Sequence, residues 1–466
     1  MSILRGDIPS FDFTIQVLVI GAGACGISAA LAASDAGAEV LVLERDATPL
    51  GSTSMSTGLI PAAGTPEQAA RNIDDSAERF AEDIALKTKG RADPNLALHV
   101  AQESAETIAW LRDTHAAPLQ FVDGFLYPGH SRMRMYGTPN RSGSELQGAL
   151  EAALGRTDAS LLTNATVRDL YVDGEVVVGV RVERPDGDFE RIGCQSLILA
   201  CCGYGGDPEM VATHIPEMAE AVYHGHPGNR GDAVKWGQAL GAELADMSGY
   251  QGHGGLAAGF GVPILWPQIM EGGFQINAHG QRFSNEAAGY SEQAREVNGQ
   301  PGRVAWTISD GRLHDLMMGF EDYQDAVRAG AVQEAADAAA IAAIIGAPPE
   351  AVAQTLTNVE SCVLGEVADI FGRDFTGKPL LCAPYRIAKV TGALFHTQGG
   401  LAVNADARVK KLGGGVFPNL FAGGGAARGL SGPGPAGYLA GNGLLTATTL
   451  GKLAGRAAAH QVTSGS

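Results

Sequence analysis

The sequence lacks the features that would place the protein in a membrane or on a metal. No apolar run reaches the roughly 18 residues of a membrane-spanning helix. Residues 1–12 contain neither the basic nor the apolar part of a signal peptide. The six cysteines form no CxxC or CxxCH motif, the patterns typical of zinc and of attached haem. We therefore expect no membrane span, no metal and a reducing, cytoplasmic location.

Basic residues are scarce as well. The chain has 33 Lys and Arg against 51 Asp and Glu, which gives a formal net charge of −18. Nucleic-acid binding needs a basic surface, and docking on anionic membranes needs basic clusters, so both are disfavoured. Apolar residues make up 45% of the chain and charged residues 18%, which is typical of a globular protein with a core.

Glycine, in contrast, is abundant: 64 of 466 residues, about double the usual share. There is no G-X-Y repeat, so collagen is excluded. Glycine permits tight turns and a close approach of the backbone to a ligand. The glycines gather at Gly21 to Gly26, Gly51 to Gly58, Gly203 to Gly206, Gly252 to Gly273, Gly399-Gly400 and Gly413 to Gly443.

The first glycine stretch has the context of a dinucleotide site. A strand is predicted over 15–20, then Gly21-Ala-Gly23-Ala-Cys-Gly26, a helix over 27–36 and a strand over 39–43 that ends at Glu44. In such a βαβ unit the glycines permit the turn, the approach of a pyrophosphate and helix packing, and the helix N-terminus attracts phosphate. Glu44 would accept hydrogen bonds from ribose hydroxyls and disfavours NADP. FAD and NAD both stay open on this motif.

Further motifs follow in order along the chain: Gly51 to Gly58, Leu199 to Gly203, Gly231-Asp232 with Gly241-Ala-Glu, Ile276 to Glu286, His396 to Gly400 and the run from Asn419 to Gly455. Together with the fingerprint they resemble the fumarate reductase/succinate dehydrogenase flavoprotein family, over nearly the whole chain. The superfamily includes the 3-ketosteroid dehydrogenases, and that branch is the most similar.

The resemblance implies an α/β fold with an α+β cap. A Rossmann-like FAD-binding domain would comprise residues 1–245 and 386–466, and a smaller capping, catalytic domain would interrupt it at 246–385. By pattern, 159–182 predicts a β-hairpin with Asp173-Gly174 at its turn. Helices are predicted over 329–345, 350–366 and 442–458.

The resemblance also implies FAD. Ser52 occupies the position of the histidine that bonds FAD covalently in respiratory members, so non-covalent FAD is expected. The flavin's pyrimidine edge would lie at the N-terminus of the last helix, where free N–H groups stabilise reduced flavin. The expected cofactor residues are Gly21, Gly23, Ala24, Gly26, Glu44, Arg45, Ser52, Thr53, Ser54, Ser56, Thr57, Gly58, Val167, Ala200, Cys201, Gly203, Asp232, Gly424, Gly425, Gly441, Asn442, Gly443, Leu444 and Leu445.

The reacting residues depart from the family pattern. Soluble fumarate reductases hold a dicarboxylate with two histidines and two arginines. His253 and His396 match the histidines. The clamping arginine aligns with Tyr438, the proton-donor arginine with His314 and the relay arginine with Tyr290.

This substitution pattern favours a neutral ketone substrate. Arginine binds a carboxylate through two parallel hydrogen bonds, whereas a tyrosine leaves that buried charge unpaired, at considerable cost. A tyrosine O–H can donate to a ketone and stabilise a developing enolate. We expect a dehydrogenase that introduces or reduces a Cα–Cβ double bond beside a ketone of a 3-ketosteroid or a smaller cyclic ketone. Tyr438 and the Gly441 N–H would polarise the ketone, and Tyr290 or His314 would accept the proton.

Residues 125–136 mix basic, aromatic and methionine side chains. We expect a loop through which substrate enters, with Arg132, Arg134 and Tyr136 in contact with it. An arginine there would bind an anionic group, in which case the substrate is a keto acid.

Other functions stay open. One is a fumarate- or urocanate-type reductase of an unsaturated acid, anchored by Arg132, Arg134, Arg428 or His396. The others are a flavin-dependent amino-acid or hydroxy-acid oxidase and a flavin-binding scaffold without activity. The sequence has no haem or iron–sulfur motif, so the electron donor or acceptor would be a separate molecule. Substrate identity, the direction of the reaction and a homo-oligomeric state are left open.

Overall fold

The computed structural model describes residues 2–6, 8–124 and 126–463. The chain forms two compact units. The first comprises 1–216, 225–250 and 396–466, and the second comprises 217–224 and 251–395. The chain passes from the first unit to the second after residue 250 and returns to the first after residue 395. The sequence placed these boundaries after residues 245 and 385. The short segment 217–224, which the sequence assigned to the first FAD-binding segment, belongs to the second unit.

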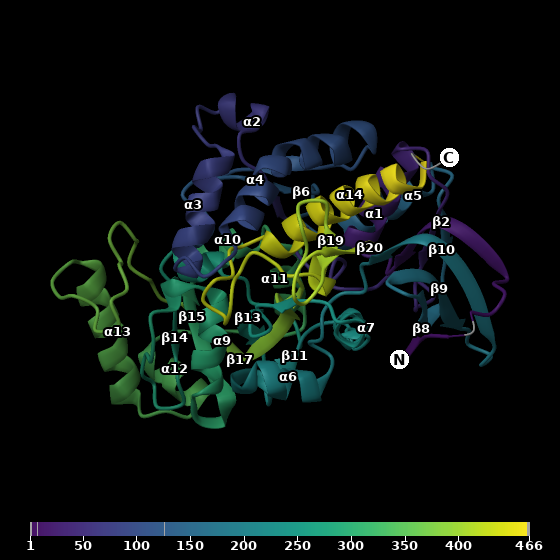
Figure 1. The fold of residues 1–466 in the computed structure, drawn as a ribbon. Helices are drawn as coiled ribbons and strands as arrows, with labels where there is room; N and C mark the ends of the chain where they lie inside the picture. Colours follow the sequence, from purple (N-terminus) through teal and green to yellow (C-terminus); the bar gives the residue numbers. More distant parts are fainter. Residues whose placement is uncertain (1, 7, 125, 464–466) are drawn as a thin grey trace. The chain divides into compact units, whose positions relative to one another are not determined.

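The first unit begins with the predicted βαβ arrangement (Figure 1). Strand β2 (Phe13–Ile20), helix α1 (Ala24–Asp35) and strand β3 (Val40–Leu43) follow one another, and β2 pairs with β3 in parallel. Gly26 is required here, because a Cβ at this position would overlap the carbonyl oxygen of Gly21. The helix can therefore pack directly on the strand end, as the fingerprint predicts.

The main sheet of this unit has the strand order β1-β8-β9-β10-β2-β3-β7. Strands β8 (Thr166–Asp173) and β9 (Val176–Glu183) form an antiparallel hairpin, and β10 (Phe189–Leu199) pairs with both β9 and β2. Strand β20 (Val416–Ala422) adds to β10 in parallel. The predicted hairpin turn at Asp173-Gly174 is present, whereas residues 160–162 form a separate strand, β7, beside β3.

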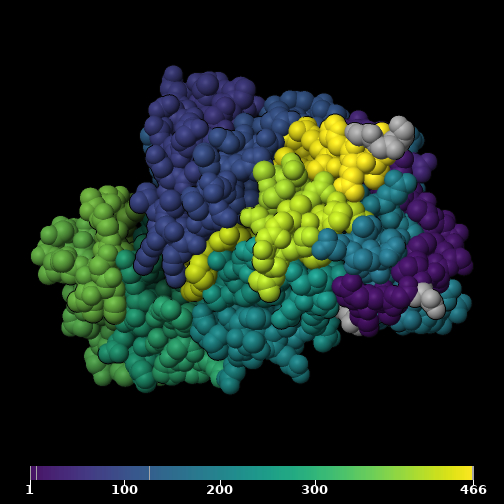
Figure 2. Space-filling model, viewed as in Figure 1, coloured from purple at the N-terminus to yellow at the C-terminus, as the bar shows by residue number. Residues whose placement is uncertain are grey.

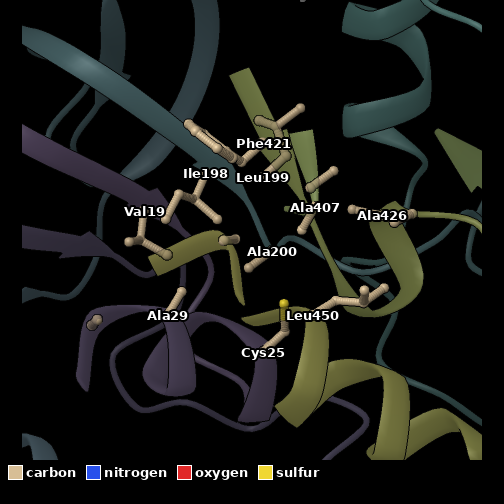
Figure 3. Packing of buried hydrophobic residues seen from close by; sticks show 14 of the residues in the cluster. Val19, Cys25, Ala29, Ile198, Leu199, Ala200, Ala407, Phe421, Ala426 and Leu450 are labelled. Carbon is tan, nitrogen blue, oxygen red and sulfur yellow. The ribbon is translucent and has the colours of Figure 1, made fainter. Parts of the chain in front are cut away.

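The C-terminal helix α14 (Asn442–Thr463) packs against α1 (Figure 1). Gly451 and Gly455 lie at this contact, since a Cβ on either would overlap a carbonyl oxygen of α1. Figure 3 shows the apolar core where Cys25 and Ala29 of α1 and Leu450 of α14 meet residues of the sheet. In Figure 2 the yellow surface of α14 lies beside the lime surface of the residues that precede it.

The unit contains further helices and strands. The helices are α2 (Pro66–Ala69), α3 (Ala77–Thr88), α4 (Pro94–Ala109), α5 (Gly143–Leu154), α6 (Pro208–His214) and α7 (Asp232–Leu240). The strands are β1 (Ser2–Leu4), β4 (Ile60–Pro61), β5 (Gln120–Val122), β6 (Met135–Gly137), β7 (Ser160–Leu162), β12 (Leu244–Ala245), β18 (Gly400–Leu401) and β19 (Arg408–Lys410).

The second unit is built on a six-stranded sheet. Its long strand β17 (Tyr385–Thr397) pairs antiparallel with β15 (Val304–Asp310) and β16 (Val332–Ala335). The other strands are β11 (Val222–Tyr223), β13 (Tyr250–Ala257) and β14 (Phe274–Ile276). The helices are α8 (Pro267–Met270), α9 (Tyr290–Asn298), α10 (Gly311–Met317), α11 (Glu321–Arg328), α12 (Ala338–Ile345) and α13 (Pro349–Val363).

One predicted helix of this unit is wrong in its first half. Residues 332–335 form strand β16, and only 338–345 form helix α12. The Asp337 side chain accepts a hydrogen bond from the backbone N–H of Ala340 and so begins the helix there. The pairing of β16 with β17 joins residues about fifty positions apart, so alanine-rich composition alone does not reveal it. The α/β architecture itself is confirmed. Over the described part of the chain, no helix is both long and apolar enough to span a membrane.

Candidate functional site

The glycine loop after β2 is held by two acceptor side chains. The backbone N–H of Ala22 donates to Glu44 Oε2 (2.9 Å), and that of Ala24 donates to Thr53 Oγ1 (2.9 Å). Glu44 Oε1 accepts a second backbone bond, from Asp46 (3.1 Å). Glu44 is thus engaged by the loop itself, and the further lone pairs of its carboxylate can still accept ribose hydroxyls.

The hydroxyl-rich segment 51–58 folds onto the start of α1, as the bond between Thr53 and Ala24 demonstrates. Ser54 Oγ donates to the carbonyl of Gly51 (2.9 Å), and Ser56 Oγ donates to that of Thr53 (2.7 Å). These bonds make the segment a compact turn. Thr57 follows this turn, directly before Gly58.

Ser52 lies next to two side chains from distant parts of the unit. Its Oγ is 3.5 Å from Cys202 Sγ and accepts a hydrogen bond from Asn229 Nδ2 (3.2 Å). Sequence reasoning did not select Asn229, because it belongs to no fingerprint motif. Ala200, Cys201 and Gly203 follow the C-terminal end of β10, and a Cβ on Gly425 would lie 2.8 Å from the backbone nitrogen of Gly203.

Arg45 links the end of β3 to the start of α7. Its Nη1 donates to the carbonyl oxygen of Gly228 (2.6 Å), and its Nη2 donates to Asp232 Oδ2 (3.1 Å). Burial raises the pKa of Asp232, while the Arg45 charge opposes that shift. The other carboxylate oxygen, Asp232 Oδ1, is buried and has no hydrogen-bond partner among the described residues. Val167 lies on β8 of the same unit and is buried.

The start of α14 is suited to a bound polar group. Gly441 has φ +81°, and a Cβ there would lie 2.6 Å from Pro61 Cδ, so only glycine fits. Asn442 is fully buried, and neither its amide oxygen nor its amide nitrogen has a hydrogen-bond partner within the described chain. Buried polar atoms are normally paired. The unpaired amide and the helix N-terminus therefore fit a ligand with hydrogen-bonding groups and negative charge. Gly443, Leu444 and Leu445 continue this turn, while Gly424 and Gly425 form a 3-10 turn that packs near α14.

His396 and Tyr438 meet at this helix start. Their ring centroids are 5.4 Å apart in an edge-on arrangement, and a Cβ on Gly443 would lie 3.1 Å from His396 Nε2. Gln398 Nε2 donates to His396 Nδ1 (3.1 Å), and Ser431 Oγ donates to Gln398 Oε1 (2.8 Å). Nδ1 also lies 3.5 Å from the carbonyl oxygen of Thr397. The shorter contact, to Gln398, favours the neutral tautomer with the proton on Nε2. Burial lowers the pKa of His396 to about 4, so the ring is neutral at pH 7. Sequence reasoning missed Gln398, although it lies only two residues from His396.

The phenol of Tyr438 is held by the backbone. The N–H groups of Gly443 and Gly441 hydrogen-bond its oxygen, and burial raises its pKa. The phenol is therefore protonated at neutral pH. It can accept from the helix terminus and donate through its own O–H.

In the second unit, His253 lies in an aromatic cluster. Its ring stacks on Tyr290 (centroids 5.2 Å apart) and Phe395 (5.1 Å), and Trp266 meets it edge-on. The backbone N–H of Gly255 donates to His253 Nδ1 (3.0 Å), so Nε2 carries the proton of the neutral ring. Burial lowers the pKa of His253 to about 3.

The structure thus brings His253 and Tyr290 together, whereas His314 has a different neighbour. His314 Nδ1 lies 3.1 Å from the hydroxyl of Tyr323, and the two rings pack edge-on. Trp266 and Phe395 were not selected from the sequence, since isolated aromatic residues are typical of any core.

The arginine-rich segment 126–136 does not fit the expected substrate contact, and Phe125 lies outside the described residues. Arg134 is fully buried and forms ion pairs with Asp75 (2.9 Å) and Asp83 (2.5 Å). Two carboxylates neutralise its charge in the interior, which disfavours the expected anion-binding role. Arg132 donates to the backbone oxygens of Asp74 and Ser131.

Tyr136, the third expected substrate residue, is also interior. It is fully buried, and its hydroxyl contacts Thr65 Oγ1 (2.6 Å) and Glu67 Oε2 (2.9 Å). The hydroxyl is therefore engaged by the protein, which disfavours the expected substrate contact. Arg428, named as an anchor for an unsaturated acid, is paired with Asp93 and Asp246.

Comparison with known proteins gives consistent similarities. A family model described as an FAD binding domain matches residues 16–444. A probable fumarate reductase from Shewanella frigidimarina is 28% identical over 453 residues, covering 96% of this chain and 75% of the relative. A urocanate reductase from Eggerthella lenta is 26% identical over 430 residues, covering 88% and 69%.

Solved structures show the same similarity. The open conformation of a flavocytochrome c3 fumarate reductase has a TM-score of 0.81 and 27% identity, covering 97% of this chain and 79% of that one. A 3-ketosteroid-Δ4-(5α)-dehydrogenase from Rhodococcus jostii RHA1 has a TM-score of 0.77 over 97% and 98%, at 23% identity, which is a likeness of fold alone. The family resemblance drawn from the motifs is confirmed.

Proposed function

This chain belongs to the FAD binding domain family, and from that premise we propose that it is an FAD-dependent oxidoreductase of carbon–carbon double bonds. Specifically, it introduces or reduces the Cα–Cβ double bond next to a ketone. The observation that carries the proposal is Tyr438, a protonated phenol at the N-terminus of α14. No arginine aligns there to bind a carboxylate.

The cofactor would be held by the residues of the first unit. The glycine loop at Gly21 to Gly26, the segment 51–58, Asp232 and the start of α14 would contact it. Among the described residues, Asp232 Oδ1 and the amide of Asn442 are buried without a hydrogen-bond partner and would be free to bond the cofactor. When bound, FAD supplies acceptance or donation of a hydride at N5. We propose that it is held non-covalently, because Ser52 offers a hydroxyl that already accepts a hydrogen bond from Asn229.

Tyr438 would polarise the substrate ketone. As the α-proton leaves, negative charge develops on the ketone oxygen, and a positioned O–H donor stabilises that charge. The Gly441 and Gly443 N–H groups support the phenol oxygen, which makes the phenol a stronger donor. His396, neutral with its proton on Nε2, is a second donor at the same helix start.

A proton acceptor is also needed. We propose Tyr290, which stacks on His253 in a buried aromatic cluster. His253 is neutral and acts as a hydrogen-bond donor through Nε2. His314 is the weaker candidate, because its ring bonds to the hydroxyl of Tyr323.

A reductase of an unsaturated acid is the second candidate. It is favoured by the relatives named fumarate reductase and urocanate reductase. Two neutral histidines could donate to a carboxylate. Of the arginines considered as charge partners, Arg134 and Arg428 are each already paired with two carboxylates, which disfavours a dicarboxylate. Arg132 donates to backbone oxygens and stays a candidate anchor for an acid. In either case a separate electron donor or acceptor completes the reaction, and the cytoplasmic location stays a prediction.

The test is anaerobic reduction of the bound flavin by a panel of substrates. Saturated cyclic ketones, 3-ketosteroids and succinate are mixed with the oxidised protein, and loss of flavin absorbance is followed. The reduced protein is mixed with the matching enones, fumarate and urocanate. We expect the ketone or enone members to react. Reaction with the acids alone would replace this proposal by the second candidate.

The same assay tests Tyr438. Tyr438→Phe keeps the ring that packs on His396 but removes the donor, so the rate with the reactive ketone should fall roughly 100-fold or more. Tyr171→Phe, in the buried strand β8, is the matched control and should react as the wild type does. An unchanged rate in Tyr438→Phe contradicts the assigned role.

A further inference from the structure

His130 is a buried histidine that the proposed reaction does not use. Only 4% of its surface is exposed. Its Nε2 lies 3.0 Å from the carbonyl oxygen of Ala440, and its Nδ1 lies 3.2 Å from Arg134 Nη1. Arginine can only donate and a carbonyl can only accept, so the two partners fix the neutral tautomer with the proton on Nε2. Burial together with the Arg134 charge lowers the pKa of His130 to about 3, which keeps this tautomer at neutral pH.

Arg134, on one side of His130, is held by two carboxylates. Arg134 is fully buried and is itself held by Asp75 through two bonds (2.9 and 3.0 Å) and by Asp83 (2.5 Å). Asp83 also accepts from the backbone N–H of Ser131 (2.8 Å), next to His130. The ion pairs therefore fix the imidazole, and the imidazole fixes the carbonyl of Ala440.

Ala440 occupies a special place in the backbone before α14. The carbonyl of Leu439 accepts from the N–H of Asn442 (3.1 Å), and the carbonyl of Gly441 accepts from Leu445 (3.0 Å). For the Ala440 carbonyl, which lies between them, His130 provides the donor. Gly441, with φ +81°, has no side chain to resist rotation of this peptide.

The orientation of this peptide group decides where the next N–H points. In a trans peptide the C=O and the following N–H point in opposite directions. Holding the Ala440 carbonyl on His130 therefore directs the Gly441 N–H the other way. That N–H hydrogen-bonds the phenol oxygen of Tyr438.

We propose that His130 is a positioning residue that fixes the orientation of the peptide group between Ala440 and Gly441. The Gly441 N–H then points to the phenol oxygen of Tyr438 at the N-terminus of α14. The buried Asp75–Arg134–His130 chain then has a function in addition to packing. The role in turnover rests on the proposed function of Tyr438, whereas the effect on the helix start does not.

Two variants separate the hydrogen bond from packing. His130→Gln places an amide N–H close to the position of Nε2 and can still donate to Ala440. His130→Asn is shorter, so its amide stays near Arg134 and loses the carbonyl. His130→Leu removes both bonds and serves as a second donor-free variant if His130→Asn fails to hold FAD.

The first readout is the reduction potential of bound FAD, which needs no substrate. Rotation of the 440–441 peptide disturbs the helix N-terminus, whose positive end stabilises the anionic reduced flavin, so we expect a lower potential in His130→Asn and a near wild-type potential in His130→Gln. A tenfold weaker stabilisation of the reduced form corresponds to about 30 mV for two electrons. Equal potentials in the wild type and both variants, or equal shifts in both variants, would overturn the proposal.

The second readout is turnover of the ketone found in the panel. We expect kcat of His130→Asn to fall roughly 10- to 100-fold with little change in KM, and His130→Gln to recover most of it. If Tyr438→Phe is fully active while His130→Asn still lowers the potential, the role of Tyr438 fails and the positioning role stands. If both variants keep the wild-type kcat on an active substrate, the positioning role fails.

Discussion

Tyr438 and His396 lie at the N-terminus of the same helix. The hydrogen bonds that hold each side chain could not be predicted from its residue type. Tyr438 rests on two backbone N–H groups, and His396 rests on a side-chain relay through Gln398 to Ser431. The sequence placed both residues among the motifs of a reaction centre. Which nitrogen of His396 carries the proton follows only from its neighbours.

For Arg134, in contrast, the sequence did not predict the surroundings of the side chain. In the sequence it lies in a basic, aromatic segment that is compatible with binding an anion. Its two carboxylate partners, Asp75 and Asp83, precede it by 59 and 51 positions. A sequence pattern of short range contains no information about such partners, so burial and neutralisation could not be predicted.

The buried histidines predict a pH dependence of stability. Burial lowers the pKa of His396 to about 4, whereas a histidine of the unfolded chain titrates near 6.5. Between these values the unfolded state binds more protons than the folded state. The free energy of unfolding therefore decreases as the pH falls below about 6.5, by up to about 1.4 kcal/mol per pH unit for one histidine.

Denaturant unfolding of the wild type and of His396→Gln at pH 7, 6, 5 and 4.5 measures this effect. The variant should lose less stability than the wild type over this range. The exposed His460 at the end of α14 provides the control, because His460→Gln should retain the wild-type slope. Identical slopes for both variants would show that His396 is not the group that titrates.

At the scale of elements, the contact between α1 and α14 depends on two glycines. A Cβ at Gly451 would overlap the carbonyl oxygen of Cys25, and one at Gly455 would overlap that of Ala29. The sequence predicted the last helix despite these glycines but gave no reason for them. The structure supplies it: the backbones of the two helices approach too closely for any side chain.

We expect Gly451→Ala to lower the free energy of unfolding by about 1–3 kcal/mol, because an added methyl group forces α14 away from α1. The matched control is Gly148→Ala on α5, where a Cβ meets nothing within 4 Å. There the better helix propensity should stabilise the protein by up to about 1 kcal/mol. Thermal unfolding of both variants and of the wild type measures these changes in stability. A Gly451→Ala variant as stable as Gly148→Ala would contradict the packing argument.

The helix predicted over 329–345 was wrong in its first half because of pairing between elements. Helix propensity favoured the whole alanine-rich stretch, yet the edge of β17 accepts residues 332–335 as a strand. Propensity is a weak preference that long-range pairing overrides. Helices α13 and α14 and the 173–174 turn were found because helix-forming patterns, the Pro348-Pro349 break before α13 and turn residues act locally.

At the scale of the whole molecule, the residues expected at FAD all belong to one compact unit. They come from chain segments separated by hundreds of residues, including Gly21 to Gly26, Asp232 and Gly441 to Leu445. The two histidines proposed for the reaction divide between the units: His396 belongs to the first and His253 to the second. The second unit therefore contributes its own aromatic cluster around His253.

Non-covalent FAD is tested on the intact protein. Acid precipitation should release all of the flavin into the supernatant, because the resemblance drawn from the sequence places Ser52, and no histidine, at the expected attachment position. Flavin that stays in the precipitate would contradict this. Cys202, whose Sγ is 3.5 Å from Ser52 Oγ, would then be the first attachment site to examine, by loss of retention in Cys202→Ser.

The sequence by itself determined the βαβ fingerprint, the order of the flavoprotein motifs and the pair of residues at the last helix. These features are encoded by glycines, caps and spacings within a few turns of chain, where backbone geometry is local. The tertiary structure alone decided which charged groups are neutralised, which tautomers the buried histidines adopt and which peptide His130 holds. Those properties depend on partners brought together from distant positions, and the electrostatics of a buried group is set by such partners rather than by its own identity.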